Sequence, residues 1–331
     1  MTTAGLAGAA EQEAPRSGTP GGEPTGVLLM TFGSAVTADD VPGYLASVRR
    51  GRQPSQEVVT EFRRRYALIG RSPLIDITRA QAAALQAVLD ARFRPGRYRV
   101  GVGMLHSRPA IEEAVAELAS VTGLSRLIGI VLAPQFSPII MAGYSRALEA
   151  AAGSGSALEV SLAGPWHRVG GFIDCLSECL AQALERLAAD RRSSVPVIFT
   201  AHSLPRSVVD RDPGYIEQIL ETVEAVADRA GLAPERRQFA YQSAGHTPEE
   251  WLKPDFRDLL PGLRKAGHRE VLVVPTQFLS DHLEILYDID IAGREEAEEQ
   301  GIAFHRIHMP NTSPSLIDAL AEVVGREDHP P

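Results

Sequence analysis

Short apolar segments rich in β-branched residues alternate along this chain with longer segments in which apolar residues recur at helical spacing. The strand-like segments span residues 27–32, 98–104, 126–131, 158–162, 195–200, 238–242, 270–274 and 302–306. Helical periodicity marks residues 42–52, 58–68, 80–92, 111–121, 172–189, 215–230 and 315–324. Alternation of this kind is typical of parallel sheets covered by helices on both faces, so the pattern predicts an α/β fold.

The strand-like segments divide evenly on either side of Gly164-Pro165. We therefore expect two doubly wound, Rossmann-like halves, each with a four-stranded parallel sheet flanked by helices. Residues 26–164 would form the N-terminal half, and residues 165–308 the C-terminal half that carries the metal-site residues. The last helical segment, 313–325, lies beyond the final strand and is free to pack back on the first half. Residues 1–25, rich in Ala, Gly, Pro, Thr and Glu, are predicted to be a disordered tail.

The composition, 44% apolar and 23% charged, is ordinary for a globular protein, and the net charge of −9 argues against broad nucleic-acid binding. No apolar run approaches the ~18 residues of a membrane span, and no signal peptide is evident, so we expect a cytoplasmic protein without an integral membrane segment. Cys175 and Cys179 share a helical face, which suits core packing or, alternatively, a metal pair. An iron–sulfur cluster would need roughly four thiolates, more than this chain has.

The common nucleotide and hydrolase motifs are missing from the sequence. There is no G-x-G-x-x-G after the first strand, no phosphate-binding loop, no H-E-x-x-H and no G-x-S-x-G. We therefore expect no tightly bound cofactor, and a sugar-phosphate or nucleotide binder would rest on analogy of fold alone.

Ionisable side chains follow two of the strand-like segments. His202 comes just after residues 195–200, and Glu284 and Asp288 follow residues 270–274. Ligand crevices of open α/β sheets form at the carboxyl ends of strands. A histidine there can be structural, or it can act as a base or metal ligand near neutral pH. Two acids four residues apart would share a helix face and repel each other unless a cation lies between them, so the set favours a site that removes protons and transfers a divalent metal.

Other charged segments leave alternatives open. Asp290 and the acids of residues 295–299 are expected to form a solvated face. The long connection between the first strand and residue 80 is basic, with arginines at positions 49, 50, 52, 63, 64, 65 and 71. These arginines form either a solvated helix face or a clamp for a ligand with several carboxylates or phosphates.

Two motifs, Thr-Ala-His-Ser-Leu-Pro at 200–205 and Phe-Leu-Ser-Asp-His-Leu-Glu-Ile-Leu-Tyr-Asp at 278–288, resemble the signatures of ferrochelatases. The resemblance extends from about residue 26 to 324 and includes residues 132–137, 242–245, 251–254 and 309–311. It implies insertion of ferrous iron into a porphyrin in haem biosynthesis. It also implies that His202 and Glu284 are the catalytic, metal-binding pair, with Asp288 as a possible outer metal ligand.

Residues 49–52, 65–70 and 72–74 most resemble the soluble bacterial type of the family, which acts on coproporphyrin III. Four propionates on that porphyrin suit an arginine-rich rim. The positions implied to line the porphyrin site are Phe32, Arg49, Arg65, Tyr66, Ser72 and Tyr144. From the resemblance we expect the porphyrin and Fe²⁺ to be substrates. We also expect a monomer that makes transient contacts with neighbouring haem-pathway enzymes.

The sequence departs from its soluble relatives at two positions: Phe32 replaces a tyrosine able to ligate iron, and Ala292 replaces a third acid. Three alternatives therefore stay open, namely a protoporphyrin IX ferrochelatase, a cobalt or nickel tetrapyrrole chelatase, and a non-catalytic haem or porphyrin carrier. Among the other histidines, His106 is expected to be structural rather than a cleft wall, His246 structural, and His282 a residue that orients the acidic helix.

Overall fold

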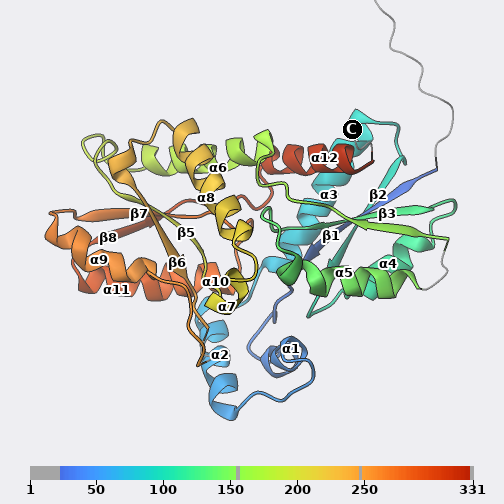
Figure 1. The fold of residues 1–331 in the computed structure, drawn as a ribbon, viewed down its shortest axis with the longest axis horizontal. Helices are drawn as coiled ribbons and strands as arrows, with labels where there is room; N and C mark the ends of the chain where they lie inside the picture. Colours follow the sequence, from blue (N-terminus) through green and yellow to red (C-terminus); the bar gives the residue numbers. More distant parts are fainter. Residues whose placement is uncertain (1–22, 154–156, 246–247, 329–331) are drawn as a thin grey trace, which may run out of the picture.

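The computed structural model describes residues 23–153, 157–245 and 248–328. Within them, two four-stranded parallel sheets lie side by side, with strand orders β2-β1-β3-β4 and β6-β5-β7-β8 (Figure 1). The strands are β1 (Thr25–Thr31), β2 (Tyr98–Met104), β3 (Arg126–Val131), β4 (Glu159–Leu162), β5 (Val197–His202), β6 (Arg237–Gln242), β7 (Glu270–Pro275) and β8 (Ala303–Arg306). The predicted fold class and all the predicted strands are confirmed, and the two sheets share one topology.

Helices cover both faces of each sheet (Figure 1). They are α1 (Val41–Val48), α2 (Gln56–Ile69), α3 (Leu74–Arg92), α4 (Ile111–Ala119), α5 (Pro138–Ala152), α6 (Gly170–Glu185), α7 (Arg206–Val209), α8 (Gly214–Arg229), η1 (Pro234–Arg236), α9 (Phe256–Lys265), α10 (Leu283–Leu286), the π-helix η2 (Asp288–Gly293), α11 (Arg294–Glu299) and α12 (Pro314–Asp328). The sequence pattern did not mark α5, although its start has a clear signal: Ser137 accepts a hydrogen bond from the Ile140 N–H (3.5 Å) ahead of Pro138.

Alternate side chains of the central strands enter two different cores. In β1, Val27 and Leu29 pack with α3 and α12, whereas Leu28 and Met30 pack with α4 and α5. β5 and β7 alternate in the same way between their two faces. Because successive residues of a strand point to opposite faces, a strand buried on both sides is apolar throughout, which is the run seen in the sequence.

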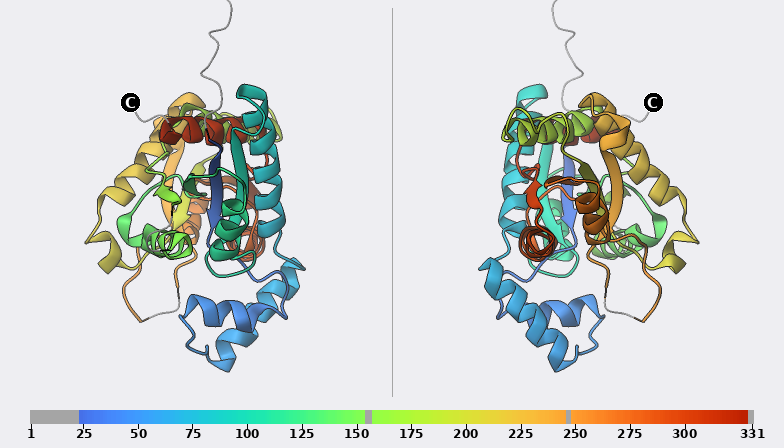
Figure 2. Two further views of the ribbon diagram at one scale, coloured as in Figure 1. Left: turned by 90° about the vertical axis from the view of Figure 1, so that its right-hand side faces the viewer. Right: turned by 90° about the vertical axis from the view of Figure 1, so that its left-hand side faces the viewer.

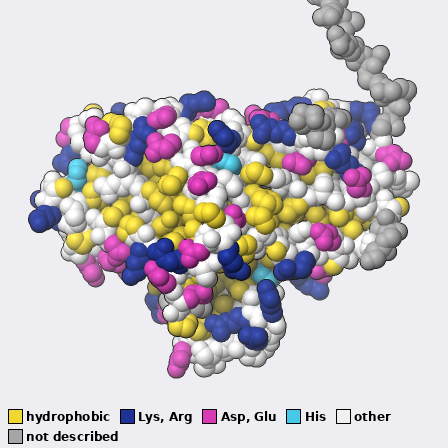
Figure 3. Space-filling model, in the orientation of Figure 1, with side chains coloured by type: hydrophobic (Ala, Val, Ile, Leu, Met, Phe, Trp, Pro, Cys, Tyr) yellow, Lys and Arg dark blue, Asp and Glu magenta, His cyan; other side chains and the backbone are white. Residues whose placement is uncertain are grey.

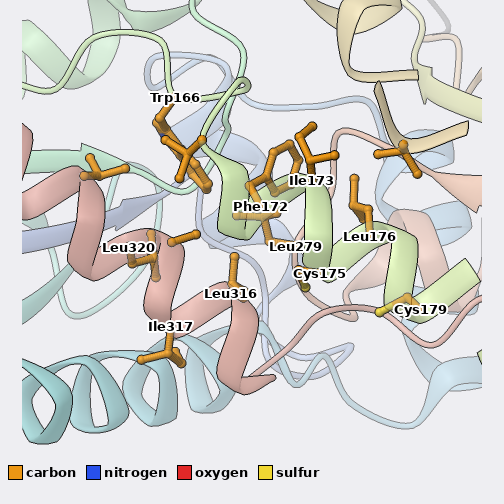
Figure 4. Close-up of a cluster of buried hydrophobic side chains, with 14 of the residues drawn as sticks. Trp166, Phe172, Ile173, Cys175, Leu176, Cys179, Leu279, Leu316, Ile317 and Leu320 are labelled. Carbon is orange, nitrogen blue, oxygen red and sulfur yellow. The ribbon is translucent and has the colours of Figure 1, made fainter. Parts of the chain in front are cut away.

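One hydrophobic core runs through both halves of the protein. Side chains of α3, α6, α8 and α12 form it together with β1, β3, β5 and β7, and Figure 4 shows Phe172, Leu316 and Leu320 within it. Helix α12 packs on α6, α3 and β3. Cys175 and Cys179 are buried in the same core as free thiols, which confirms their predicted packing role.

The connection between β1 and α3 forms a separate helical projection of α1 and α2. Figures 1 and 2 show it extending away from both sheets, next to the segment that carries α10. Val59 and Tyr66 of the projection pack against Leu283 and Tyr287, which follow β7 in the other half. The basic α1–α2 projection of the first half therefore packs against the segment that follows β7 in the second half.

The predicted tail, residues 1–25, lies mostly outside the described residues. The prediction is wrong for Thr25, which starts β1 and pairs with Tyr98 and Arg126. Among the helices that the structure describes, none is both long enough and apolar enough to cross a membrane.

The end of α12 is anchored to the first sheet by Asp328, whose side chain is 2% exposed. Its carboxylate accepts hydrogen bonds from Arg97 (2.5 Å), Arg126 (3.2 Å) and the Tyr98 hydroxyl (2.8 Å). A buried carboxylate is stable only when such partners replace its hydration. This network joins the last helix to β2 and β3.

Replacing Asp328 by Ala should lower the free energy of unfolding by about 3–5 kcal/mol, because two partly buried guanidinium groups and a phenol lose their acceptor. Urea unfolding measures the loss. Asp318→Ala is the matched control on the same helix, since its ion pair with Arg92 is exposed and worth about 0–1 kcal/mol. Equal stability of the Asp328 variant and the unmodified protein would contradict the anchoring role.

Candidate functional site

His202 is the last residue of β5, at the carboxyl end of a strand that pairs with β6 and β7. Its backbone N–H donates to Oε1 of Gln277, just after β7, at 2.9 Å. Its Nδ1 lies 2.5 Å from the Ser203 carbonyl oxygen. Since a carbonyl can only accept, Nδ1 carries the proton, and Nε2 keeps a lone pair for a base or ligand role.

The segment after β7 is not the single α-helix that the spacing of Glu284 and Asp288 predicted. The four residues of α10 contain Glu284, and Asp288 begins the π-helix η2. Such π segments occur often at functional sites. Gly293 closes the π turn against α9, where a Cβ atom would lie 2.6 Å from the Phe256 ring, so this position requires a glycine.

His202, Glu284, Asp288 and Arg65 line one cavity of about 320 Å³. The structure thus brings together the imidazole and the two acids that the sequence singled out, and adds Arg65 of α2 to them. The other lining residues are Phe62, Ser243, Ala244, Gly245, Phe256, Arg257, Leu283, Tyr287 and Ala292. Within the described residues, no three His, Cys, Asp or Glu side chains lie close enough to form a metal-binding cluster.

Burial raises the pKa of Asp288 above its usual value, and the negative charge of Glu284 raises it further. A hydrogen bond from Ser243 and the positive charge of Arg65 oppose this rise. Ser243 has a φ of +58°, an uncommon backbone conformation for a residue other than glycine. The carboxyl group at this position is therefore easier to protonate than an exposed aspartate.

Glu284 has a histidine partner. His282 Nε2 lies 3.2 Å from its Oε2, and His282 Nδ1 lies 2.8 Å from the Ser280 carbonyl oxygen, to which it must donate. This geometry agrees with the expectation that His282 orients the acidic segment.

Arg65 faces the acids. Its Nε lies 2.8 Å from Glu61, its Nη1 lies 3.4 Å from Asp288, and its guanidinium stacks over the Tyr287 ring at 4.9 Å. The side chain is 17% exposed. The positive charge that two adjacent carboxylates need therefore comes from the α1–α2 projection.

The remaining residues expected at a porphyrin site lie outside this cavity. Phe32 follows β1, the counterpart of His202 at the end of β5. The residue is 44% exposed, and its ring centroid lies 4.5 Å from that of His106 in a T-shaped contact. Tyr66, Ser72 and Tyr144 are buried, and Tyr66 shares a 2.9 Å hydrogen bond with Ser34. Arg49 is exposed at the end of α1.

Sequence reasoning missed several residues of the site. Tyr44 is one of them: burial and the nearby charge of Glu284 raise the pKa of its phenol. Ser243 and Tyr287 belong to motifs that the sequence had marked, so their neighbourhood was visible. Arg257 carried no signal, because its place in the cavity depends on how α9 packs.

Asp290 is not part of a solvated face, and that prediction is wrong. Its carboxylate accepts two hydrogen bonds from Arg306, both 2.7 Å long, and its side chain is 25% exposed. His106 lies beside Ser47 (Nδ1 to Oγ, 3.1 Å), and burial lowers its pKa. His246 lies outside the described residues.

The chain is similar in sequence to known proteins. A family model described as Ferrochelatase matches residues 24–328. The ferrochelatase of Deinococcus radiodurans is 38% identical over 307 residues, which cover 92% of this chain and 96% of that protein. The coproporphyrin III ferrochelatase of Bacillus subtilis is 33% identical over 301 residues, or 90% of this chain and 96% of that protein.

The chain belongs to the ferrochelatase family. It is accordingly an enzyme, a metal chelatase of the lyase class. Among solved structures, SirB from Bacillus subtilis with Fe³⁺ has the same fold at 11% identity, with a TM-score of 0.56 over 92% of this chain and 95% of that chain.

Replacing Asp288 by Asn should stabilise this ferrochelatase-family protein at neutral pH. A carboxyl pKa raised above its usual 3.8 means that the folded state holds the proton more tightly than the unfolded state. Deprotonation then favours unfolding as pH rises, and each pKa unit is worth about 1.4 kcal/mol. The variant's gain should be absent below pH 3.8, grow through the folded pKa and then level off.

Urea unfolding between pH 3 and 8 measures the difference in stability between the variant and the unmodified protein. Steps of about one pH unit suffice, because a single group changes its protonation ratio tenfold over that interval. Asp76→Asn serves as the control, because Asp76 is an exposed acid paired with Arg71. A stability gap for Asp288→Asn that is constant with pH, or that favours the unmodified protein at neutral pH, would contradict the raised pKa.

Proposed function

We propose that this protein inserts ferrous iron into coproporphyrin III during haem biosynthesis. Membership of the ferrochelatase family supports iron insertion into a porphyrin. The observation that carries the proposal is that the imidazole of His202 and the carboxylate of Glu284 line the same cavity. The names of the coproporphyrin III ferrochelatases at 33–35% identity support this choice of porphyrin.

Insertion of Fe²⁺ into a porphyrin releases two pyrrole protons, so the site needs a base beside the macrocycle. His202 suits this role, since its Nδ1 proton is engaged by the Ser203 carbonyl oxygen and its Nε2 is left as acceptor. Asp288, whose pKa burial raises, is a second group able to take a proton, and His282 lies 3.2 Å from Glu284.

In this proposal, Glu284, assisted by Asp288, receives ferrous iron and passes it to the porphyrin. Fe²⁺ binds nitrogen donors more strongly than carboxylate oxygens. Transfer of the iron to the four pyrrole nitrogens therefore lowers its free energy. Arg65 limits the repulsion between the two acids, lying 3.4 Å from Asp288.

We propose that the macrocycle lies between the ends of β1 and β5, with Phe32 on one face and His202 on the other. The exposed Phe32 ring can stack on the macrocycle but cannot ligate iron. Figure 3 shows Lys and Arg side chains on and near the α1–α2 projection, where Arg49 and Arg52 are exposed and available to propionates. Tyr66, Ser72 and Tyr144 would complete the porphyrin site.

We also propose that the protein works as a cytoplasmic monomer without a tightly bound cofactor and contacts other haem-pathway enzymes transiently.

Replacing His202 by Ala should lower kcat by about 10²–10⁴-fold, because the base is lost. Porphyrin should still bind, since its propionates contact other residues. Anaerobic insertion assays give kcat, and quenching of protein fluorescence gives porphyrin affinity. His268→Ala, outside the cavity, is the control, and near-normal turnover by His202→Ala would refute the assignment.

Coproporphyrin III should be a better substrate than protoporphyrin IX, because its four propionates offer more partners to the arginines of the projection. Anaerobic Fe²⁺ is added to the protein with each porphyrin in turn, and the loss of metal-free porphyrin fluorescence is followed. A higher kcat/KM with protoporphyrin IX would contradict the choice of substrate. Binding without insertion of iron into either porphyrin would favour a carrier.

A further inference from the structure

Arg306, the last residue of β8, contacts both ends of the acidic segment, which we define as residues 281–290. Its Nε and Nη2 each donate to the Asp290 carboxylate at 2.7 Å. Nη2 also donates to Oδ1 of Asp281 at 3.3 Å. The three side chains are only 12%, 25% and 23% exposed, respectively, so solvent screens these ion pairs poorly.

The two aspartates enclose the metal-handling residues in the sequence. Asp281 precedes Glu284, and Asp290 follows Asp288, so one guanidinium group closes a bridge across the α10–η2 turn. Four carboxylates within ten residues repel one another, and α10 has only four residues of its own. The bridge opposes that repulsion and ties the segment to the rigid edge strand of the second sheet.

The two ends are anchored differently. Asp281 has a second anchor in Asn311, which donates from Nδ2 at 2.8 Å and accepts the Asp281 N–H at 3.0 Å. The Asp290 carboxylate is held by the paired bonds of Arg306. Arg306 therefore matters most for the π-helix, where Asp288 begins the turn and faces the cavity.

We propose that Arg306 is a positioning residue that sets the geometry of Glu284 and Asp288 relative to His202. It acts on the handling of iron and not on the binding of porphyrin, because its side chain donates to Asp281 and Asp290 of the acidic segment and to the Ile307 carbonyl. This inference rests on the proposed role of Glu284 and Asp288 in iron transfer.

The surroundings of Arg306 allow a direct test by chemical rescue. Its side chain lines a second cavity of about 490 Å³, together with Arg186, Arg294, His305 and His308. Asp290 lines the same cavity, so truncation of Arg306 to alanine would leave the Asp290 carboxylate open to a small cation. Methylguanidinium could then enter and pair bidentately with the carboxylate, whereas methylammonium could not.

Arg306→Ala should raise the KM for Fe²⁺, or lower kcat at saturating porphyrin, by about 10–100-fold, as is typical when a residue that orients metal ligands is lost. The KM for porphyrin should stay within about twofold, a change too small to reflect the loss of a hydrogen bond. Methylguanidinium should return the KM of Arg306→Ala for Fe²⁺ most of the way to that of the unmodified protein, and methylammonium should not. Arg306→Lys should recover only part of the activity, because lysine is a point charge that cannot form the bidentate pair.

Arg186→Ala is the matched control: Arg186 lines the same cavity, and it donates a hydrogen bond to the backbone carbonyl of Arg306 at 3.3 Å. It should behave like the unmodified protein. If Arg306→Ala binds porphyrin but keeps the iron kinetics of the unmodified protein, or responds equally to methylguanidinium and methylammonium, the positioning role is overturned. If Arg306→Ala does not fold, Asp290→Asn takes its place, and an unchanged iron KM in that variant overturns the role equally. An unmodified protein that inserts no iron would instead refute the proposed function itself.

Discussion

The parallel pairing of β5 with β6 and β7 is the constraint on which the site depends. It aligns His202 with Gln242 and ends the three strands at one edge of the sheet. Gln242 accepts a hydrogen bond from Thr200 at 2.6 Å and donates through Nε2 to the Glu284 carbonyl at 3.4 Å. The backbone that carries the imidazole is thus coupled, through residues of one sheet edge, to the backbone that carries the carboxylate.

The site is built against the local preferences of its parts. Burial raises the pKa of Asp288, Ser243 has a positive φ, and the helix changes from α to π between Glu284 and Asp288. Each feature costs free energy, which the large core shared by α3, α6, α8 and α12 offsets. A rigid frame can hold a few unfavourable groups in place, and chemistry with protons and metal ions requires such groups.

The two sheets have the same strand order, yet their carboxyl ends differ chemically. β1 leads to an aromatic residue, Phe32, and β5 ends in an imidazole, that of His202. The α1–α2 projection belongs to the first half in sequence, but its Arg65 meets Asp288 of the second half. The functional unit is therefore assembled from both halves, and neither sheet contains it alone.

The sequence by itself determined the alternation of strands and helices, the eight strands and the family. Those features depend on local periodicity and contiguous motifs, which survive without knowledge of distant contacts. It also marked His202, Glu284 and Asp288, because each lies next to a strand end. Tertiary structure decided what surrounds them: Arg306 binds Asp290, Arg65 turns to the acids, and Tyr44 and Arg257 approach the cavity. Such contacts join residues far apart in the chain, and their energies depend on burial and orientation, which no local pattern encodes.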